Sequence, residues 1–274
     1  PIKSSAASDV YKRQHFFKAS AILALAAVVG VCINISNLYH TYEYSKETMR
    51  GKSELKQEGA VASQTSSGLD RDYITNWSYG IGETLTLLVP NVKGGGSGST
   101  MSQSEVAMAK ANPMYRGIYS QLPQYFGEQP WTAGPVYVGA FVMFLFVLGC
   151  FIVKGPLKWA LLGATIFSIL LSWGKNFMGL TDFFIDYVPM YNKFRAVSSI
   201  LVIAEFTIPL LAIFALKEIL SKPDTLKLKE NRGGVIATLV LTAGVALILA
   251  VAPGAFFSGF ITTQEMAALK QELP

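Results

Sequence analysis

Apolar residues are concentrated in five segments that contain almost no charge. At about 1.5 Å of rise per residue, each segment is long enough to cross a hydrocarbon core of about 30 Å as a helix. The pattern predicts membrane-spanning helices at residues 19–35, 135–153, 157–173, 197–216 and 234–251. We therefore expect an all-α polytopic integral membrane protein, a helical bundle of about five spans.

A long region without a continuous apolar run, residues 37–134, separates the first two segments. Unstructured loops of that length are uncommon, so we expect a small folded cap or a set of interfacial helices there. Residues 60–68 and the run Gly94 to Ser99 have the composition of flexible linkers, and the glycine run lacks the residues of a phosphate-binding loop. We expect this run to act as a lid or hinge.

The pattern also predicts an order of domains. Residues 1–14 resemble the artefactual lead-in of a translated sequence assembly, and they are left out of the fold prediction. The first span falls within residues 15–36, the loop region is 37–134, and spans two to five fill 135–251. Residues 252–274 would begin a further region, in which Thr262 and Glu265 have the spacing of a capping box and predict a helix start.

Charge predicts the orientation of the spans. The chain is 51% hydrophobic and 15% charged, with a net charge of +5, yet residues 37–134 hold eight Lys or Arg against nine Asp or Glu. Lys154 and Lys158 lie in one short turn, and five basic residues lie between positions 217 and 232. Because short cytoplasmic loops are enriched in Lys and Arg, residues 37–134, 174–196 and 252–274 are predicted to be extracytoplasmic. The basic residues do not cluster on one soluble face, so the predicted partner is membrane lipid and not nucleic acid.

Three neighbouring residues of the loop region, Asp70, Arg71 and Asp72, form the first candidate site. Two carboxylates could share a divalent cation that holds a phosphate, and Arg could pair with phosphate oxygens. The alternative is a turn with local ion pairs. Because an Asp-x-Asp pair is common by chance, we predict no metal and no cofactor.

The segment before the fourth span contains the second candidate site. Asp182 and Asp186 would share one face of a helix because they are four residues apart. Lys193 and Arg195 follow at the predicted level of the lipid headgroups. These two cations could hold a lipid phosphate or could only anchor the segment at the interface.

Glu205 is the ionisable residue well inside a predicted span. A carboxylate at that depth is costly, and it usually faces a bundle interior or a wet cavity. Glu205 could therefore line a substrate cavity, which Pro209 would open by bending the helix. The alternative is a structural hydrogen bond between helices.

Long strings of this sequence resemble the YfhO family of bacterial membrane proteins, in the version found in Bacteroidetes. They are NISNLYHTYEYSKETMRGKSEL at 34–55, GLDRDYITNWSYGIGETLTLLVPN at 68–91, GPVYVGAFV at 134–142, and the run from VKGPLKWALL to LSWGKNFMGLTDFFIDYVPMYNKFRAV at 153–197. The resemblance extends from about residue 15 to the end of the chain. Members are longer, so it implies that this chain is an internal fragment of a multi-pass protein of the bacterial cytoplasmic membrane.

The resemblance also implies a function. The family is similar to GT-C membrane glycosyltransferases, which transfer sugar from a polyprenyl-phosphate donor to an envelope acceptor at the outer face. The catalytic acid is expected in an outer loop upstream of this fragment, so no catalytic residue is assigned and the fragment alone is expected to be inactive. Lys193 and Arg195 would lie near the lipid phosphate. The alternatives are a transporter or flippase of lipid or oligosaccharide, and a membrane scaffold without chemistry.

Overall fold

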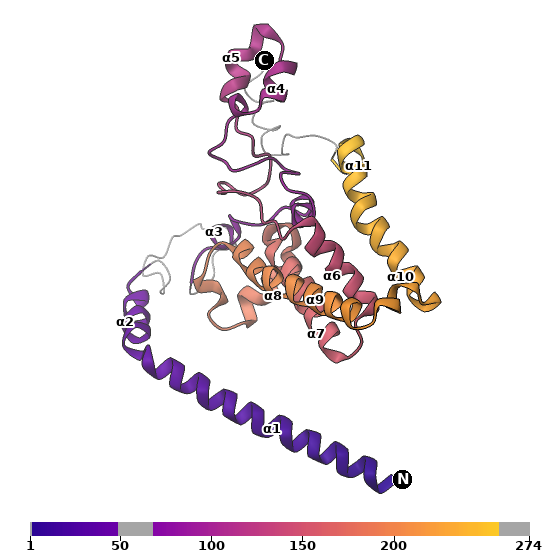
Figure 1. Cartoon of the computed structure of the whole chain (residues 1–274). Helices are drawn as coiled ribbons and strands as arrows, with labels where there is room; N and C mark the ends of the chain where they lie inside the picture. Colours follow the sequence, from indigo (N-terminus) through magenta and orange to yellow (C-terminus); the bar gives the residue numbers. More distant parts are fainter. Residues whose placement is uncertain (1, 49–67, 258–274) are drawn as a thin grey trace. The chain divides into compact units, whose positions relative to one another are not determined.

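The computed structural model describes residues 2–48 and 68–257. The chain divides into two units, residues 1–68 and 69–274, which are described separately. In the described residues every regular element is helical, and β pairing is limited to two isolated bridges (Figure 1). The helix start predicted at Thr262 and nearly all of the linker predicted at 60–68 lie outside the described residues.

The first unit contains two helices, α1 (Ile2–Ile33) and α2 (Ile35–Lys46). The part of α1 from Arg13 to Ile33 is long and apolar enough to cross a membrane. Its side chains are exposed on all sides, as expected of an apolar helix whose surroundings are lipid. The predicted first span is therefore a helix, which also continues through most of the lead-in at 1–14.

Three helices form the core of the second unit: α6 (Ala140–Ile152), α7 (Pro156–Ser172) and α9 (Val202–Ser221). Helix α9 packs against both of the others, and its Ala204, Ile208 and Leu211 are fully buried. A Cβ on Gly149 of α6 would lie 3.1 Å from the carbonyl oxygen of Leu211, so a small residue permits this close crossing.

The remaining long helix runs through α10 (Lys229–Leu239), a π-helical turn (Val240–Gly244) and α11 (Val245–Val251). It packs against the end of α6, where a Cβ on Gly234 would meet Phe151. At the same end Nζ of Lys154 lies 3.9 Å from Oε1 of Glu230. The two basic turns of the sequence therefore meet at one end of the bundle, as a shared cytoplasmic side requires.

A sharp bend separates α7 from α8 (Met178–Tyr187). The two helical segments 156–172 and 174–187 meet at 110°. Gly174 has φ +45°, and a Cβ there would lie 2.1 Å from Oγ of Ser78 and 2.5 Å from Cγ2 of Val197. The bend therefore needs glycine for both its conformation and its space.

The structure supports a helical membrane bundle but not a count of five spans. Among the described residues, three helices could cross a membrane by length and composition, or four if the bent pair counts as one span. The predicted span at 135–153 is wrong in extent, because α6 has only 13 residues. At 1.5 Å per residue it covers about 20 Å, well short of a hydrocarbon core.

Within the second unit, residues 69–134 of the loop region fold onto the end of the bundle opposite the basic turns. The backbone N–H of Tyr79 donates to the carbonyl of Ser172 (2.8 Å), and that of Ser198 donates to the carbonyl of Trp77 (3.1 Å). Short helices make up this region and the connections of the unit. They are α3 (Arg71–Thr75), η1 (Gly82–Leu87), η2 (Met101–Gln103), α4 (Glu105–Lys110), η3 (Pro113–Tyr115), α5 (Arg116–Gln121), η4 (Gly174–Phe177), η5 (Tyr191–Lys193), η6 (Val197–Leu201), η7 (Pro223–Lys227) and η9 (Pro253–Ala255).

The glycine run at 94–99 differs from the predicted hinge. The N–H of Ser97 donates to the carbonyl of Thr132, and the N–H of Gln124 donates to the carbonyl of Ser99, each at 2.8 Å. A Cβ on Gly96 would lie 2.6 Å from the carbonyl oxygen of Ala133. The glycines therefore allow two backbone segments to approach closely, which composition alone does not distinguish from a flexible linker.

Candidate functional site

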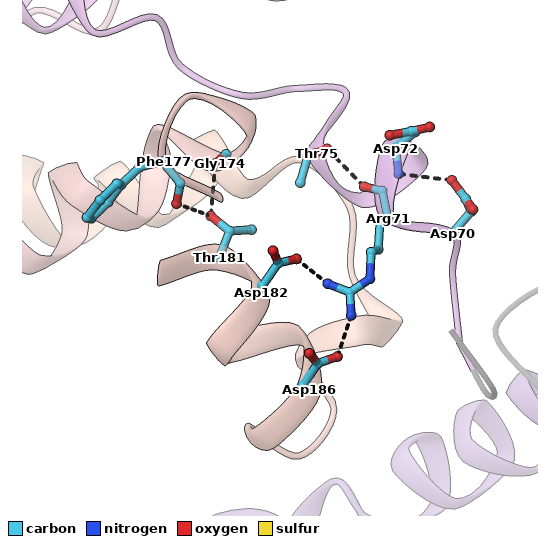
Figure 2. Close-up of polar contacts among 9 residues, drawn as sticks. All are labelled: Asp70, Arg71, Asp72, Thr75, Gly174, Phe177, Thr181, Asp182 and Asp186. Atoms are coloured by element: carbon cyan, nitrogen blue, oxygen red, sulfur yellow. Dashed lines mark hydrogen bonds and ion pairs between the residues drawn. The ribbon is translucent and has the colours of Figure 1, made fainter. Parts of the chain in front are cut away.

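The two predicted candidate sites meet through one arginine. Arg71 of α3 bonds Asp182 through Nη1, and its Nη2 lies 2.6 Å from Oδ1 of Asp186 (Figure 2). Both carboxylates belong to α8, so their shared helix face is confirmed. The hydrogen bond to Asp186, partly offset by burial, raises the pKa of the Arg71 guanidinium. The cluster is a salt bridge between elements more than 100 residues apart in sequence, with one cation facing two anions.

The carboxylates of Asp70 and Asp72 have separate environments. Asp70 precedes α3, and its Oδ1 accepts a hydrogen bond from the backbone N–H of Asp72 at 2.9 Å, which makes Asp70 the N-cap (Figure 2). Asp72 is exposed. In the described part of the chain no three His, Cys, Asp or Glu side chains gather as metal ligands. The geometry agrees with the turn that the sequence left as an alternative, but the ion pairs of Arg71 are with α8 and are not local.

A small apolar cluster fixes α3 in this position. It consists of Leu69, Ile74, Ile185 and Val197, all buried. In addition, the N–H of Leu69 donates to the carbonyl of Asn192 at 3.0 Å. The loop region, α8 and the start of η6 are thus packed together at one end of the bundle.

Arg195 lies over two aromatic rings, one from a residue in α3 and one from a residue just after it. Its guanidinium carbon is 5.5 Å from the ring centre of Tyr73 and 5.1 Å from that of Trp77, and Nη1 donates to the Tyr73 hydroxyl at 2.9 Å. Guanidinium has five N–H donors, so four have no hydrogen-bond partner among the described residues. Arg195 is exposed, and two residues later begins the apolar segment Val197–Ser221. We call Arg195, Tyr73 and Trp77 the arginine platform.

The segment that contains Lys193 and Arg195 is flanked in sequence by two non-glycine residues with left-handed backbone conformation. Met190 has φ +70° and Ala196 has φ +64°. Between them Lys193 ends η5, half-buried, and its N–H donates to the carbonyl of Met190 at 3.0 Å. The tight turns direct the chain back across α3, which places Arg195 on its rings. Such strained residues persist only where surrounding contacts hold them.

Glu205 lies on the exposed side of α9, next to the exposed Val202 and Phe206. No hydrogen bond or ion pair joins it to another described residue. The structural hydrogen bond between helices therefore has no partner within the described part of the chain. Which environment the carboxylate faces in the membrane stays a prediction.

A buried carboxylate that the sequence did not single out is Glu83, at 3% exposure. Its Oε1 accepts from the Tyr125 hydroxyl at 2.6 Å, and its Oε2 accepts from the N–H of Gly80 at 2.7 Å and of Glu128 at 3.2 Å. A Cβ on Gly127 would lie 2.2 Å from Oε1 of Glu83. Burial, followed by the charge of Glu83 and the hydrogen bond to it, raises the pKa of Tyr125. The two glycines that precede Glu83 in the segment 78–83 are the local sign that its side chain lies close to the backbone. Its partner Tyr125 could not be found from local sequence, because it lies 42 residues away.

Glu83 lies beside a hollow of about 360 Å³. Its other charged lining residues are Lys93 and Glu128, and Phe256 and Phe257 also line it. Nζ of Lys93 lies 4.4 Å from the ring centre of Phe257. We call this space the Glu83 hollow.

Comparisons of the chain with models of protein families, with curated proteins and with solved structures found no match.

Proposed function

We propose that this chain is part of a YfhO-like protein of the bacterial cytoplasmic membrane, which transfers sugar from a polyprenyl-phosphate donor to an envelope acceptor at the outer face. One observation carries the proposal. An exposed guanidinium with four remaining N–H donors is held on two aromatic rings, two residues before an apolar helix long enough to span a membrane.

This position suits the phosphate of a lipid. A donor whose polyprenyl chain lies in the hydrocarbon core presents its phosphate at the interface, where the helix containing α9 begins. Guanidinium binds phosphate oxygens in a planar, two-pronged geometry, and stacking on rings reduces the rotamer freedom lost on binding. During transfer the same cation would stabilise the negative charge on the departing phosphate.

The nearby carboxylates favour the arginine platform over α8 as the anion site. Asp182 and Asp186 share one cation, Arg71, so that cluster carries a net charge of −1. Arg71 is therefore occupied, whereas Arg195 bonds only a neutral hydroxyl. The base that activates the acceptor hydroxyl would come from outside this chain, as the family resemblance implies.

The test is calorimetric titration of farnesyl phosphate into the full chain in nanodiscs of phosphatidylcholine. Farnesyl phosphate should bind and farnesol should not, because the phosphate is the recognised group. Arg195→Gln should weaken binding about tenfold, which corresponds to about 1.4 kcal/mol. Adding Lys193→Gln should weaken it further.

Arg116→Gln is the matched control, because Arg116 is also exposed but lies in α5, away from the platform. It should bind farnesyl phosphate as the wild type does. Equal affinities of the Arg195→Gln variant and the wild type, with equal thermal unfolding midpoints, would reduce Arg195 to an interfacial anchor and overturn the proposal.

A further inference from the structure

We propose that the Glu83 hollow binds the sugar of the lipid donor, as a subsite for a neutral polyhydroxyl ring. The inference rests on the proposed function, because it assigns the second half of the ligand whose phosphate the arginine platform would hold. It depends on a different set of residues, in the segments around Gly80, Lys93, Gly127 and Phe257.

The charges of the hollow select the class of ligand. Glu83 and Glu128 disfavour an anion, and the ammonium of Lys93 offsets the charge of one of the two carboxylates. A sugar hydroxyl both donates and accepts, so one ring can donate to the carboxylates and accept from Lys93. The volume of about 360 Å³ falls within the range of about 300–1,000 Å³ that is usual for small-ligand sites.

The Glu83 carboxylate, which lines the hollow, is held in a fixed orientation and keeps room for one more hydrogen bond. Glu83 accepts three hydrogen bonds from the protein, and a carboxylate has about four lone-pair sites, so one remains. The three donors fix its orientation before any ligand binds. A Cβ on Gly80 would lie 3.3 Å from Oε1 of Glu128, which shows that this second carboxylate folds over the backbone of Gly80. It bonds no other described residue through its own oxygens.

One segment, residues 125–131, connects the hollow with the arginine platform. At one end Tyr125 donates to Glu83 (2.6 Å), and at the other the indole N–H of Trp77 donates to the carbonyl of Trp131 (3.0 Å). Between them, Oε1 of Gln129 accepts from the Ser198 hydroxyl at 3.3 Å. Both sites therefore lie at the same end of the bundle, opposite the basic turns. A phosphate and the sugar attached to it would therefore both be bound at this end of the bundle.

The experiment compares two phosphodiesters of equal charge in the same nanodiscs, farnesyl phosphoryl glucose and farnesyl methyl phosphate. The wild-type chain should bind the glucosyl lipid about tenfold more tightly. Glu128→Gln should remove most of this preference and leave the methyl phosphodiester unaffected, because Glu128 contacts no residue of the platform. Ile81→Trp, which places a large ring at the exposed lining residue Ile81, should act in the same way.

Glu105→Gln is the matched control, since Glu105 is an exposed acid of α4 outside the hollow, and it should keep the full preference. Equal binding of the two lipids by the wild type overturns the sugar subsite and leaves the proposed function standing. A preference for the glucosyl lipid that survives Arg195→Gln with unchanged affinities supports the subsite and overturns the role of the platform. If neither lipid binds, both proposals are wrong.

Discussion

Gly174 connects α7 to α8 in a conformation that other residues rarely adopt. Its φ is +45°, and a Cβ would lie 2.1 Å from Oγ of Ser78, which itself accepts the N–H of Lys175 at 2.8 Å. Gly174→Ala should therefore lower the free energy of unfolding by about 2 kcal/mol, from backbone strain and displacement of Ser78. Thermal or denaturant unfolding in mild detergent measures the change. Gly163→Ala in α7, where a Cβ meets nothing within 4 Å, should cause no loss; equal effects of the two variants would show that the bend does not need glycine.

Tyr125 makes the free energy of unfolding depend on pH in the alkaline range. Its pKa is raised above the ordinary value of 10.0 in the folded state, first by burial and then by the charge of Glu83. Above about pH 10 the unfolded chain loses the phenol proton while the folded chain retains it, so the folded state binds more protons and stability falls as pH rises. The contribution is complete below pH 10, the ordinary pKa of the unfolded chain.

Tyr125→Phe isolates this contribution. The variant should be less stable at pH 8 by about 1.5–3 kcal/mol, because a charged acceptor loses a hydrogen-bond donor. It should also lose less stability than the wild type between pH 9.5 and pH 11. Unfolding midpoints measured across this range provide both quantities, and parallel curves would contradict the assignment. Tyr137→Phe serves as the control, since Tyr137 is 43% exposed.

At the scale of elements, α3 and α8 are joined by ion pairs that water partly screens. The side chains of Arg71 and Asp186 are 25% and 45% exposed. A double-mutant cycle of Arg71→Gln and Asp186→Asn should therefore give a coupling free energy of about 0.5–1 kcal/mol, far below that of a fully buried pair. Unfolding free energies of the four proteins measure it.

The control cycle uses Lys154→Gln and Glu230→Gln, whose charged groups are 83% and 64% exposed at 3.9 Å. Its coupling should be close to zero. A value for Arg71 and Asp186 that does not exceed this control would mean that the pair with Asp186 does not help to hold α3 in place.

The sequence predicted the bounds of a helix correctly where an apolar run begins and ends at nearly the same residues as the helix. The run at 157–173 matches α7, and the helix pattern around Asp182 and Asp186 matches α8. The run at 135–153 does not match its helix, because Gly139, at φ +100°, delays the start of α6 until Ala140. Hydropathy records which residues avoid water, but an extended segment packed in the bundle avoids water as well.

For the candidate site, sequence spacing predicted the shared face of Asp182 and Asp186 but not their partner. Arg71 lies 111 residues from Asp182, and only the tertiary fold brings the two together. The same holds for Arg195, whose rings belong to Tyr73 and Trp77, and for Glu83 with Tyr125. Some of these residues are suggested by the sequence, but no local pattern identifies which residues pair with one another.

At the scale of the whole molecule, the two ends of the bundle differ in chemistry. One end carries the basic turns, joined by Lys154 and Glu230, and the other carries the arginine platform and the Glu83 hollow. If the basic end is cytoplasmic, the proposed site faces outward. An experiment that determines the orientation of the bundle therefore also determines on which side of the membrane the proposed site lies.

Single cysteines at Glu105 and Asp224, in a chain whose Cys32 and Cys150 are replaced by Ala, test the orientation. Both sites are exposed, and they belong to the loop region and to a basic turn respectively. In intact cells, a membrane-impermeant maleimide should label Glu105→Cys and leave Asp224→Cys unlabelled until the membrane is permeabilised. The cysteine-free chain controls for background, and labelling after permeabilisation shows that both thiols are reactive. Labelling of Asp224→Cys alone in intact cells would invert the bundle and place the arginine platform on the cytoplasmic side, where a donor used at the outer face could not reach it.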